Sequence, residues 1–222
     1  MRNNPSKRKN IFFDKIKLGD HICSIYKDKE QQFSVIVPFF KAGLSNNEKC
    51  IVITGENSKE NIVLEFEKGG IEVERHAESN QLIIIEKSEA YMKGGSFNPD
   101  EMMEFWKKAE QDAIKEGYSG IRVAGEASFV GESAEDSEKL MEYESELNSF
   151  FPHMKIAAVC QYNENMLKPE ILAEAIHTHP HLIIYGKHHE NMYYSPAADI
   201  DKKHKLPSDS YEIIRDSIIK ED

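Results

Sequence analysis

The 222-residue sequence predicts an α/β domain, a three-layer α/β/α sandwich built around a mostly parallel sheet. One observation is that runs of about four to seven nearly unbroken apolar residues alternate with helical segments, which is typical of a parallel sheet covered on both faces. Another is the first structural unit, a strand, a turn and a helix laid out like a nucleotide-binding P-loop. A chain of this length can bury a substantial core in one domain.

The strands are predicted from short apolar runs rich in β-branched residues and bounded by turn residues. In chain order they lie at 21–26, 50–54, 82–85, 120–125, 155–161 and 181–185. Parallel strands of one sheet bring their carboxyl ends to the same edge, where ligands of such folds bind. The residues that follow the strands are therefore the first candidates for a site.

Helices are predicted between the strands from apolar residues at helical spacing. In chain order they lie at 33–44, 58–68, 99–116, 133–150 and 169–177. Ser58 and Pro99 are suited to begin helices, and Gly69 and Gly117 are suited to end them. Segment 27–32 is predicted as a turn and 91–99 as a loop. A weak amphipathic helix at 208–220 could pack on the core or on a partner.

The composition predicts a folded core between two polar ends. We expect a flexible segment at 1–14, one folded domain at 15–197, and a polar tail with a short helix at 198–222. The net charge of −11 opposes direct binding to nucleic acid. No apolar run approaches the roughly 18 to 20 residues that span a bilayer, and a signal peptide is not evident, so we expect a cytoplasmic protein without membrane contact.

The turn at 27–32 lacks the chemistry of a phosphate loop. A working loop reads GxxxxGK[ST], because glycines let backbone N–H groups surround the phosphates and the lysine meets their charge. Here the turn is Lys-Asp-Lys-Glu-Gln-Gln, without glycine and with two added carboxylates. We therefore expect a binding or sensing protein that is not an enzyme and needs no cofactor. An ATPase with an unconventional phosphate loop remains an alternative.

Polar and aromatic side chains at the strand ends are the candidate ligand-binding residues. Glu56 and Glu126 each follow a glycine directly after a predicted strand, so their carboxylates project at the sheet edge. We expect one partly apolar pocket there that holds a small ligand through few hydrogen bonds, with roughly micromolar to millimolar affinity. The candidate residues are His21, Cys23, Tyr26, Glu56, Glu126, Gln161, Tyr162 and His179.

A metal site is an alternative use of some of these residues. His21 and Cys23 are two apart on a predicted strand and so face the same side, a spacing that can serve a soft metal. Cys160 could join them if the two strands are neighbours. The sequence lacks the tight cysteine pairs of a closed zinc site, and buried cysteine more often acts as a small hydrophobe. A metal- or thiol-based redox sensor thus remains open.

Several short segments occur in order along residues 15 to 197 and together carry a family resemblance. They are His21-Ile22-Cys23-x-x-Tyr26, Gly43-Leu44, Glu48-Lys49-Cys50, Ile121 to Glu126, Tyr143-Glu144-x-Glu146-Leu147-Asn148, Cys160-Gln161-Tyr162, His179-Pro180 and Asn191-x-Tyr193-Tyr194-x-Pro196. This ordered set resembles the MEDS domain, the methanogen/methylotroph and DcmR sensory domain. One departure is Phe129, where members of the family often carry tryptophan.

The resemblance implies a KaiC/RecA-like core that has lost ATP binding and that senses simple hydrocarbon derivatives. Members are usually attached to DNA-binding or histidine-kinase modules. The residues after Pro196 are too few for such a module. We therefore expect a stand-alone sensory unit that acts through a separate histidine kinase or transcription regulator, with a homodimer as one arrangement.

Overall fold

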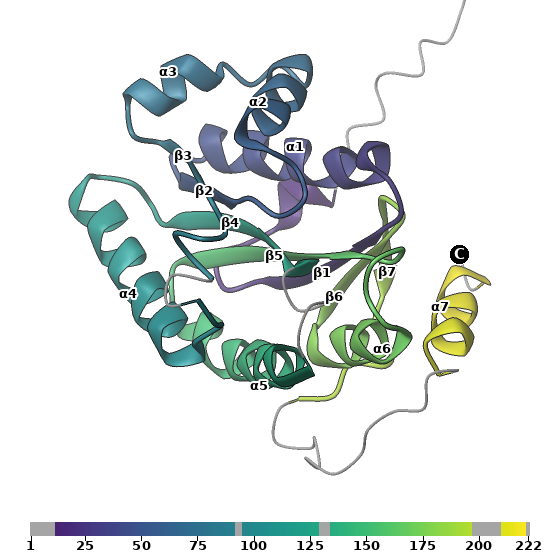
Figure 1. Ribbon diagram of the computed structural model, residues 1–222. Helices are drawn as coiled ribbons and strands as arrows, with labels where there is room; N and C mark the ends of the chain where they lie inside the picture. The colour runs from purple at the N-terminus through teal and green to yellow at the C-terminus, as the bar shows by residue number, and fades with distance from the viewer. Residues whose placement is uncertain (1–11, 92–94, 129–133, 197–209, 221–222) are drawn as a thin grey trace, which may run out of the picture.

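The computed structural model describes residues 12–91, 95–128, 134–196 and 210–220. Its centre is a seven-stranded sheet in the order β3-β2-β4-β5-β1-β6-β7, with helices on both faces (Figure 1). The strands are β1 (His21–Tyr26), β2 (Lys49–Ile53), β3 (Leu82–Ile85), β4 (Ile121–Glu126), β5 (Ile156–Asn163), β6 (His181–Ile184) and β7 (Lys187–Glu190). The predicted three-layer sandwich with a mostly parallel sheet is confirmed.

The edge strand β7 is the one strand of the described residues that the sequence pattern missed. It pairs antiparallel with β6 through a two-residue turn, in which Tyr185 and Gly186 both have positive φ angles of 50° and 82°. Such a turn matches the right-handed twist of the two strands. Because β7 lies at the sheet edge, only His189 among its four residues is buried, and the strand therefore has no apolar run to reveal it.

The helices are α1 (Lys29–Ser45), α2 (Lys59–Lys68), α3 (Val73–Glu78), α4 (Pro99–Lys115), α5 (Ala134–Phe150), α6 (Pro169–Thr178) and α7 (Ser210–Lys220). The prediction of a turn over 27–32 is wrong from Lys29 onward. Asp28 caps α1, because its carboxylate accepts a hydrogen bond from the Gln31 N–H at 2.9 Å. The short helix α3 was not predicted.

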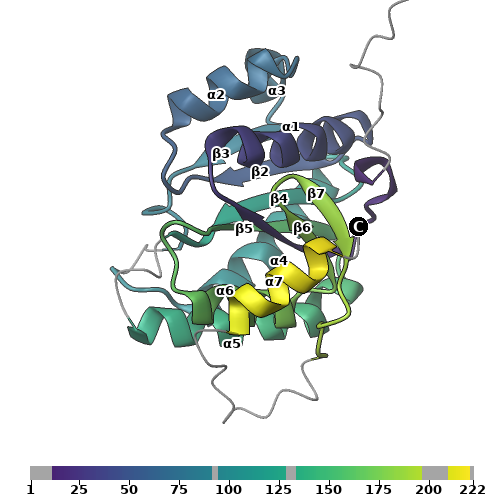
Figure 2. The ribbon, with the colours of Figure 1, turned by 90° about the vertical axis from the view of Figure 1, so that its right-hand side faces the viewer.

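Helices α1 to α3 cover one face of the sheet and α4 to α6 cover the other, while α7 packs beside α6 (Figures 1 and 2). Strands β1 and β5 are parallel neighbours, and Cys23 lies opposite Cys160 in their register. Helices α1 and α6, which follow β1 and β5, lie on opposite faces of the sheet. In open α/β sheets this is the place where ligands bind.

Among the described residues, no helix has both the length and the apolar character needed to cross a membrane.

A buried ion pair fixes the position of α1 against the sheet. The Arg122 guanidinium is fully buried and donates to both carboxylate oxygens of Glu48, at 2.5 and 3.2 Å. It also donates to the Phe39 carbonyl at 3.0 Å. Gly43 makes room for it, since a Cβ at that position would lie 2.7 Å from Arg122 Cδ. The sheet and α1 can therefore approach closely here.

Candidate functional site

The structure divides the predicted site residues between the two faces of the sheet. His21 and Tyr162 lie on the face covered by α4 to α6, as Cys23 does. Glu126 and Gln161 bind Gln32 of α1 and so lie on the opposite face. The expectation of one common pocket is wrong in this respect, because successive residues of a strand point to opposite sides. Two separate groups result.

The first group is a closed hydrogen-bond network beside α1. Gln32 Nε2 donates to Glu126 Oε2 at 3.2 Å and to Gln161 Oε1 at 3.0 Å, and it connects the carboxyl ends of β4 and β5 to the helix. Asn57 Nδ2 donates to Gln32 Oε1 at 2.9 Å. The Glu56 N–H donates to Glu126 Oε1 at 3.2 Å. Gln32 and Asn57 were not predicted, because isolated amides carry no pattern in the sequence.

The remaining predicted residues of this side surround the network. Asn163 Nδ2 donates to both oxygens of Glu56, at 3.2 and 3.0 Å. The Tyr26 ring is buried, and its burial and then the charge of Glu126 raise the pKa of its phenol. Gly55 allows the turn to pack on the carboxylate, since a Cβ there would lie 2.3 Å from Glu126 Cδ. Side chains thus fill this edge of the sheet.

Two backbone N–H groups at the start of α1 donate to side chains of the chain itself. In a phosphate loop, free N–H groups at this helix end hold the phosphates. Here the Gln31 N–H donates to the Asp28 side chain at 2.9 Å, and the Lys27 N–H donates to Gln31 Oε1 at 2.9 Å. A carboxylate of the chain therefore stands where an anionic ligand would bind.

Glu126 gives a pH-dependent prediction. Burial, and then the charge of Glu56, raise the pKa of Glu126 above its ordinary value of 4.5. The folded state therefore retains this proton at a pH where the unfolded chain has lost it. The resulting stabilisation is complete below pH 4.5 and is lost as the pH rises through the pKa of the folded state.

We expect the Glu126→Gln variant to lack this component. As the pH rises above 4.5, the wild type should lose stability relative to the variant. The free energy of unfolding of the variant minus that of the wild type should therefore increase, by at most about 1.4 kcal/mol per pH unit for one proton. Urea denaturation of both proteins at a series of pH values measures the difference. A difference that stays constant with pH would contradict the assignment.

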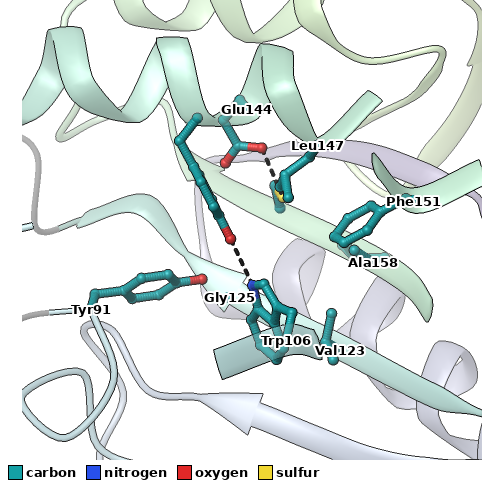
Figure 3. Close-up of a pocket in the computed structure, with 11 residues that line it drawn as sticks. Tyr91, Trp106, Val123, Gly125, Glu144, Leu147, Phe151 and Ala158 are labelled. Carbon is teal, nitrogen blue, oxygen red and sulfur yellow. Dashed lines mark hydrogen bonds between the residues drawn. The ribbon is translucent and has the colours of Figure 1, made fainter. Parts of the chain in front are cut away.

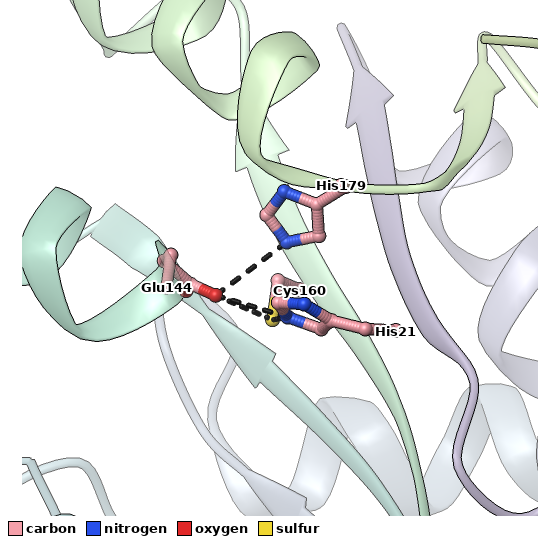
Figure 4. A group of neighbouring side chains, drawn as sticks. All are labelled: His21, Glu144, Cys160 and His179. Atoms are coloured by element: carbon pink, nitrogen blue, oxygen red, sulfur yellow. Dashed lines mark hydrogen bonds and ion pairs between the residues drawn. The ribbon is translucent and has the colours of Figure 1, made fainter. Parts of the chain in front are cut away.

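The second group is a buried cluster of His21, Glu144, Cys160 and His179 (Figure 4). His21 is on β1, Cys160 on β5, Glu144 on α5, and His179 between α6 and β6. His21 Nε2 lies 3.0 Å from Glu144 Oε2 and 3.3 Å from Cys160 Sγ. Glu144 Oε2 lies 3.4 Å from Cys160 Sγ and 3.5 Å from His179 Nε2. Figure 4 shows the two imidazoles and the thiol directed toward the carboxylate.

The electrostatics of this cluster centre on Glu144. Burial alone would raise the pKa of Glu144, but hydrogen bonds and charge from His179 and His21 hold it well below its usual range. Burial, and then the nearby Glu144, raise the pKa of the Cys160 thiol. Burial, and then the neighbouring His21, lower the pKa of His179. The cluster thus combines a carboxyl group with a lowered pKa, a thiol with a raised pKa and an imidazole with a lowered pKa.

A small cavity adjoins the cluster on its α4 side (Figure 3). Its volume is about 10 Å³, which is room for about one water molecule. Glu144 and Cys160 form part of its wall, and the Tyr91 hydroxyl points toward Gly125 across it. A Cβ on Gly125 would lie 1.9 Å from this hydroxyl oxygen. The rest of the lining is mostly apolar: Trp106, Val123, Tyr143, Leu147, Phe151, Ala158 and Val159.

Residues 20–180 match the family described as MEDS, the MEthanogen/methylotroph, DcmR Sensory domain. The chain belongs to this family. The transcriptional repressor DcmR of Methylorubrum extorquens is 24% identical over 187 residues, a match that covers 83% of this chain and 63% of the repressor. The crystal structure of a KaiC-like protein from Pyrococcus horikoshii superposes with a TM-score of 0.52 at 13% identity, over 75% of this chain and 71% of that chain. That likeness shows the fold alone.

Five of the segments that suggested the MEDS family meet at the buried cluster. Glu144 and Asn148 come from one segment on α5, and Asn148 Oδ1 accepts a hydrogen bond from His21 Nδ1 at 3.0 Å. Asn191, from another segment, donates to the His179 carbonyl at 2.7 Å. The resemblance to MEDS therefore corresponds to a physical cluster in this chain. Phe129, which departs from the family pattern, lies outside the described residues.

Glu144 is the member of the cluster that the sequence analysis did not select. One of the segments that suggested the family contains it, but a charged helix is most often solvated, so the sequence offered no reason to prefer it. Cys23 was proposed beside His21 as a metal ligand, and it is fully buried on the same face. It is not among the four residues whose ligand atoms lie together. The ligand-binding roles of the predicted residues remain predictions.

Proposed function

We propose that this MEDS domain is a sensory unit that binds a small organic molecule, a simple hydrocarbon derivative, and signals through a separate regulatory protein. Membership of a sensory family and similarity to a transcriptional repressor support a regulatory role. The proposed output partner is a histidine kinase or a transcription regulator, and a homodimer is a suitable signalling arrangement. The matched region spans 63% of the repressor's length.

The observation that carries this proposal is the occupied phosphate position at the start of α1. Asp28 binds the Gln31 N–H there, and the Gln32 network joins the helix to Glu126. A triphosphate would have to displace these bonds and approach two carboxylates. The geometry therefore favours sensing over ATP hydrolysis, in a chain that has the KaiC-like fold.

We place the ligand at the cavity beside the buried cluster. At about 10 Å³ the cavity accepts little more than one water molecule, so a larger ligand requires the covering helices α4 and α5 to move. A sensor needs such a difference, because a ligand shifts an equilibrium only by its differential affinity for two conformations. Two residues predicted from the sequence, His21 and His179, contact Glu144 in the wall of this cavity.

The ligand prediction is tested by thermal unfolding with methanol, methylamine and a halomethane. We expect at least one of them to raise the melting temperature with a saturable dependence, since a ligand at ten times its Kd adds about 1.4 kcal/mol. Gly125→Ala should abolish the effect, because its Cβ and the Tyr91 hydroxyl cannot both fit. Cys50→Ala, on the opposite face of the sheet, should retain it. Equal responses in both variants would contradict this location.

The nucleotide prediction uses the same assay. ATP with Mg²⁺ at millimolar concentration should leave the melting temperature unchanged, because side chains already accept from the Lys27 and Gln31 N–H groups at the start of α1. A rise of several degrees that the Glu126→Gln variant loses would favour the ATPase alternative instead.

A further inference from the structure

The four side chains of the buried cluster come from four separate elements and converge on one point. Their ligand atoms all lie within 4.8 Å of one another, and His21, Glu144 and His179 are almost fully buried. We propose that His21, Glu144, Cys160 and His179 bind a divalent transition-metal ion, with Zn²⁺ as the ion that fits best. This inference goes beyond the proposed sensory role and does not depend on it.

The distances between the ligand atoms suit a tetrahedral ion. Metal–nitrogen and metal–oxygen bonds of about 2.0–2.2 Å and a metal–sulfur bond of about 2.3 Å place ligand atoms roughly 3.2–3.8 Å apart. The four measured separations, which run from Glu144 to its three partners and from His21 to Cys160, are 3.0, 3.3, 3.4 and 3.5 Å. Small side-chain movements would centre an ion between them.

The hydrogen bonds around the cluster present both imidazoles in the form that binds metal. Asn148 Nδ2 donates to the Thr178 carbonyl, which leaves Asn148 Oδ1 to accept from His21 Nδ1–H at 3.0 Å. His179 Nδ1–H donates to the Ala175 carbonyl at 2.8 Å. Each Nε2 atom therefore carries a lone pair that faces the cluster. Metal-binding histidines are usually oriented in this way through their other nitrogen.

The environment of His179 Nε2 also supports a metal site. This atom is buried and has no hydrogen-bond partner among the described residues, although it lies 3.5 Å from Glu144 Oε2. A buried polar atom without a partner costs free energy. A metal ion at the centre would accept its lone pair and remove that cost.

Charge balance points to a divalent ion. In the described residues, the ion pairs of Glu144 are with His21 and His179 alone, so no lysine or arginine lies at ion-pair distance from this buried carboxyl group. An unbalanced charge in a protein interior is costly. A bound metal converts the Cys160 thiol to a thiolate, as coordinating thiols are deprotonated. One carboxylate and one thiolate then balance the two positive charges of the ion.

The donor set selects the class of metal. Two imidazole nitrogens, one thiolate sulfur and one carboxylate oxygen suit Zn²⁺, whereas Mg²⁺ and Ca²⁺ prefer oxygen ligands alone. Four protein ligands within bonding reach describe a closed tetrahedral site. Such sites contribute directly to folding stability, so the ion should also join β1, β5, α5 and the end of α6.

The test begins with wild-type protein that has been dialysed against a chelator and then titrated with Zn²⁺ or Co²⁺. We expect one tightly bound ion per chain by elemental analysis. Co²⁺ should give the absorption bands of a tetrahedral thiolate site. X-ray absorption of the zinc-loaded wild type should show one sulfur and two imidazoles, a result that needs no variant. Less than a tenth of an equivalent of bound metal, or a site without sulfur, would overturn the proposal.

Variants locate the ion. Cys160→Ser should lose the thiolate band, and His179→Asn should weaken Zn²⁺ binding at least tenfold, with far-UV circular dichroism confirming that both fold. Cys50→Ser is the control, since Cys50 is a buried free thiol on the opposite face of the sheet. Unchanged metal binding in both cluster variants, or an equal loss in the control, would place the ion elsewhere. None of these measurements uses an organic ligand, so they leave the sensory proposal to its own test.

Discussion

Replacing Glu48 by alanine is expected to lower the free energy of unfolding by about 3–5 kcal/mol. The guanidinium of Arg122 is fully buried, and both carboxylate oxygens of Glu48 accept its hydrogen bonds. The Phe39 carbonyl, which accepts a third bond, cannot neutralise its charge. The variant thus leaves a buried cation without a counter-ion, which costs much more than the net value of the pair.

Urea denaturation with a double-mutant cycle measures this effect. Glu48→Leu combined with Arg122→Leu should recover part of the loss, because removing both charges also removes their desolvation. Glu72→Ala is the control: Glu72 forms an ion pair with Arg75 at 2.6 Å, but the two side chains are 67% and 74% exposed, so we expect a loss of about 1 kcal/mol or less. A comparable loss in the two single variants would contradict the argument.

Helix α7 is expected to contribute strongly to the free energy of unfolding, because it packs on the core that α4 to α6 cover. Ile214 and Ile218 are 7% and 4% exposed within that core, together with Tyr211. Ile214→Ala and Ile218→Ala should each lower the free energy of unfolding by about 2–5 kcal/mol, through lost burial and the cavity left behind. Thermal and urea unfolding of the full chain measure both.

The same helix supplies the control. Ile213 is 68% exposed, so Ile213→Ala removes the same atoms from the surface and should change stability by no more than about 0.5 kcal/mol. The sequence left open whether this helix packs on the core or on a partner. In the structure it packs on the core, where Arg215 also donates to Glu164 at 2.8 Å. Equal effects of all three substitutions would mean that α7 is undocked in solution.

The sequence by itself determined the strands β1 to β6 and the layering of the sheet. Their apolar runs can be buried only if helices cover both faces, so the pattern leads directly to the three-layer fold. The sequence did not locate the start of α1. Asp28 caps this helix, but aspartate is favoured both at helix N-caps and in turns, so the residue type does not distinguish the two. The sequence also missed β7, whose polar residues lie at an exposed edge.

Fewer features of the candidate site than of the fold could be predicted from the sequence. Strand periodicity placed His21 and Cys23 on one side, and Cys160 was expected to join them only if the strands were neighbours. Tertiary structure decided that they are, through the pairing of β1 with β5, and it added Glu144 and His179 from elements distant in sequence. It also separated Glu126 and Gln161 to the other face. Periodicity fixes a side chain's face within its own strand, whereas the neighbours it meets depend on long-range packing of the whole chain.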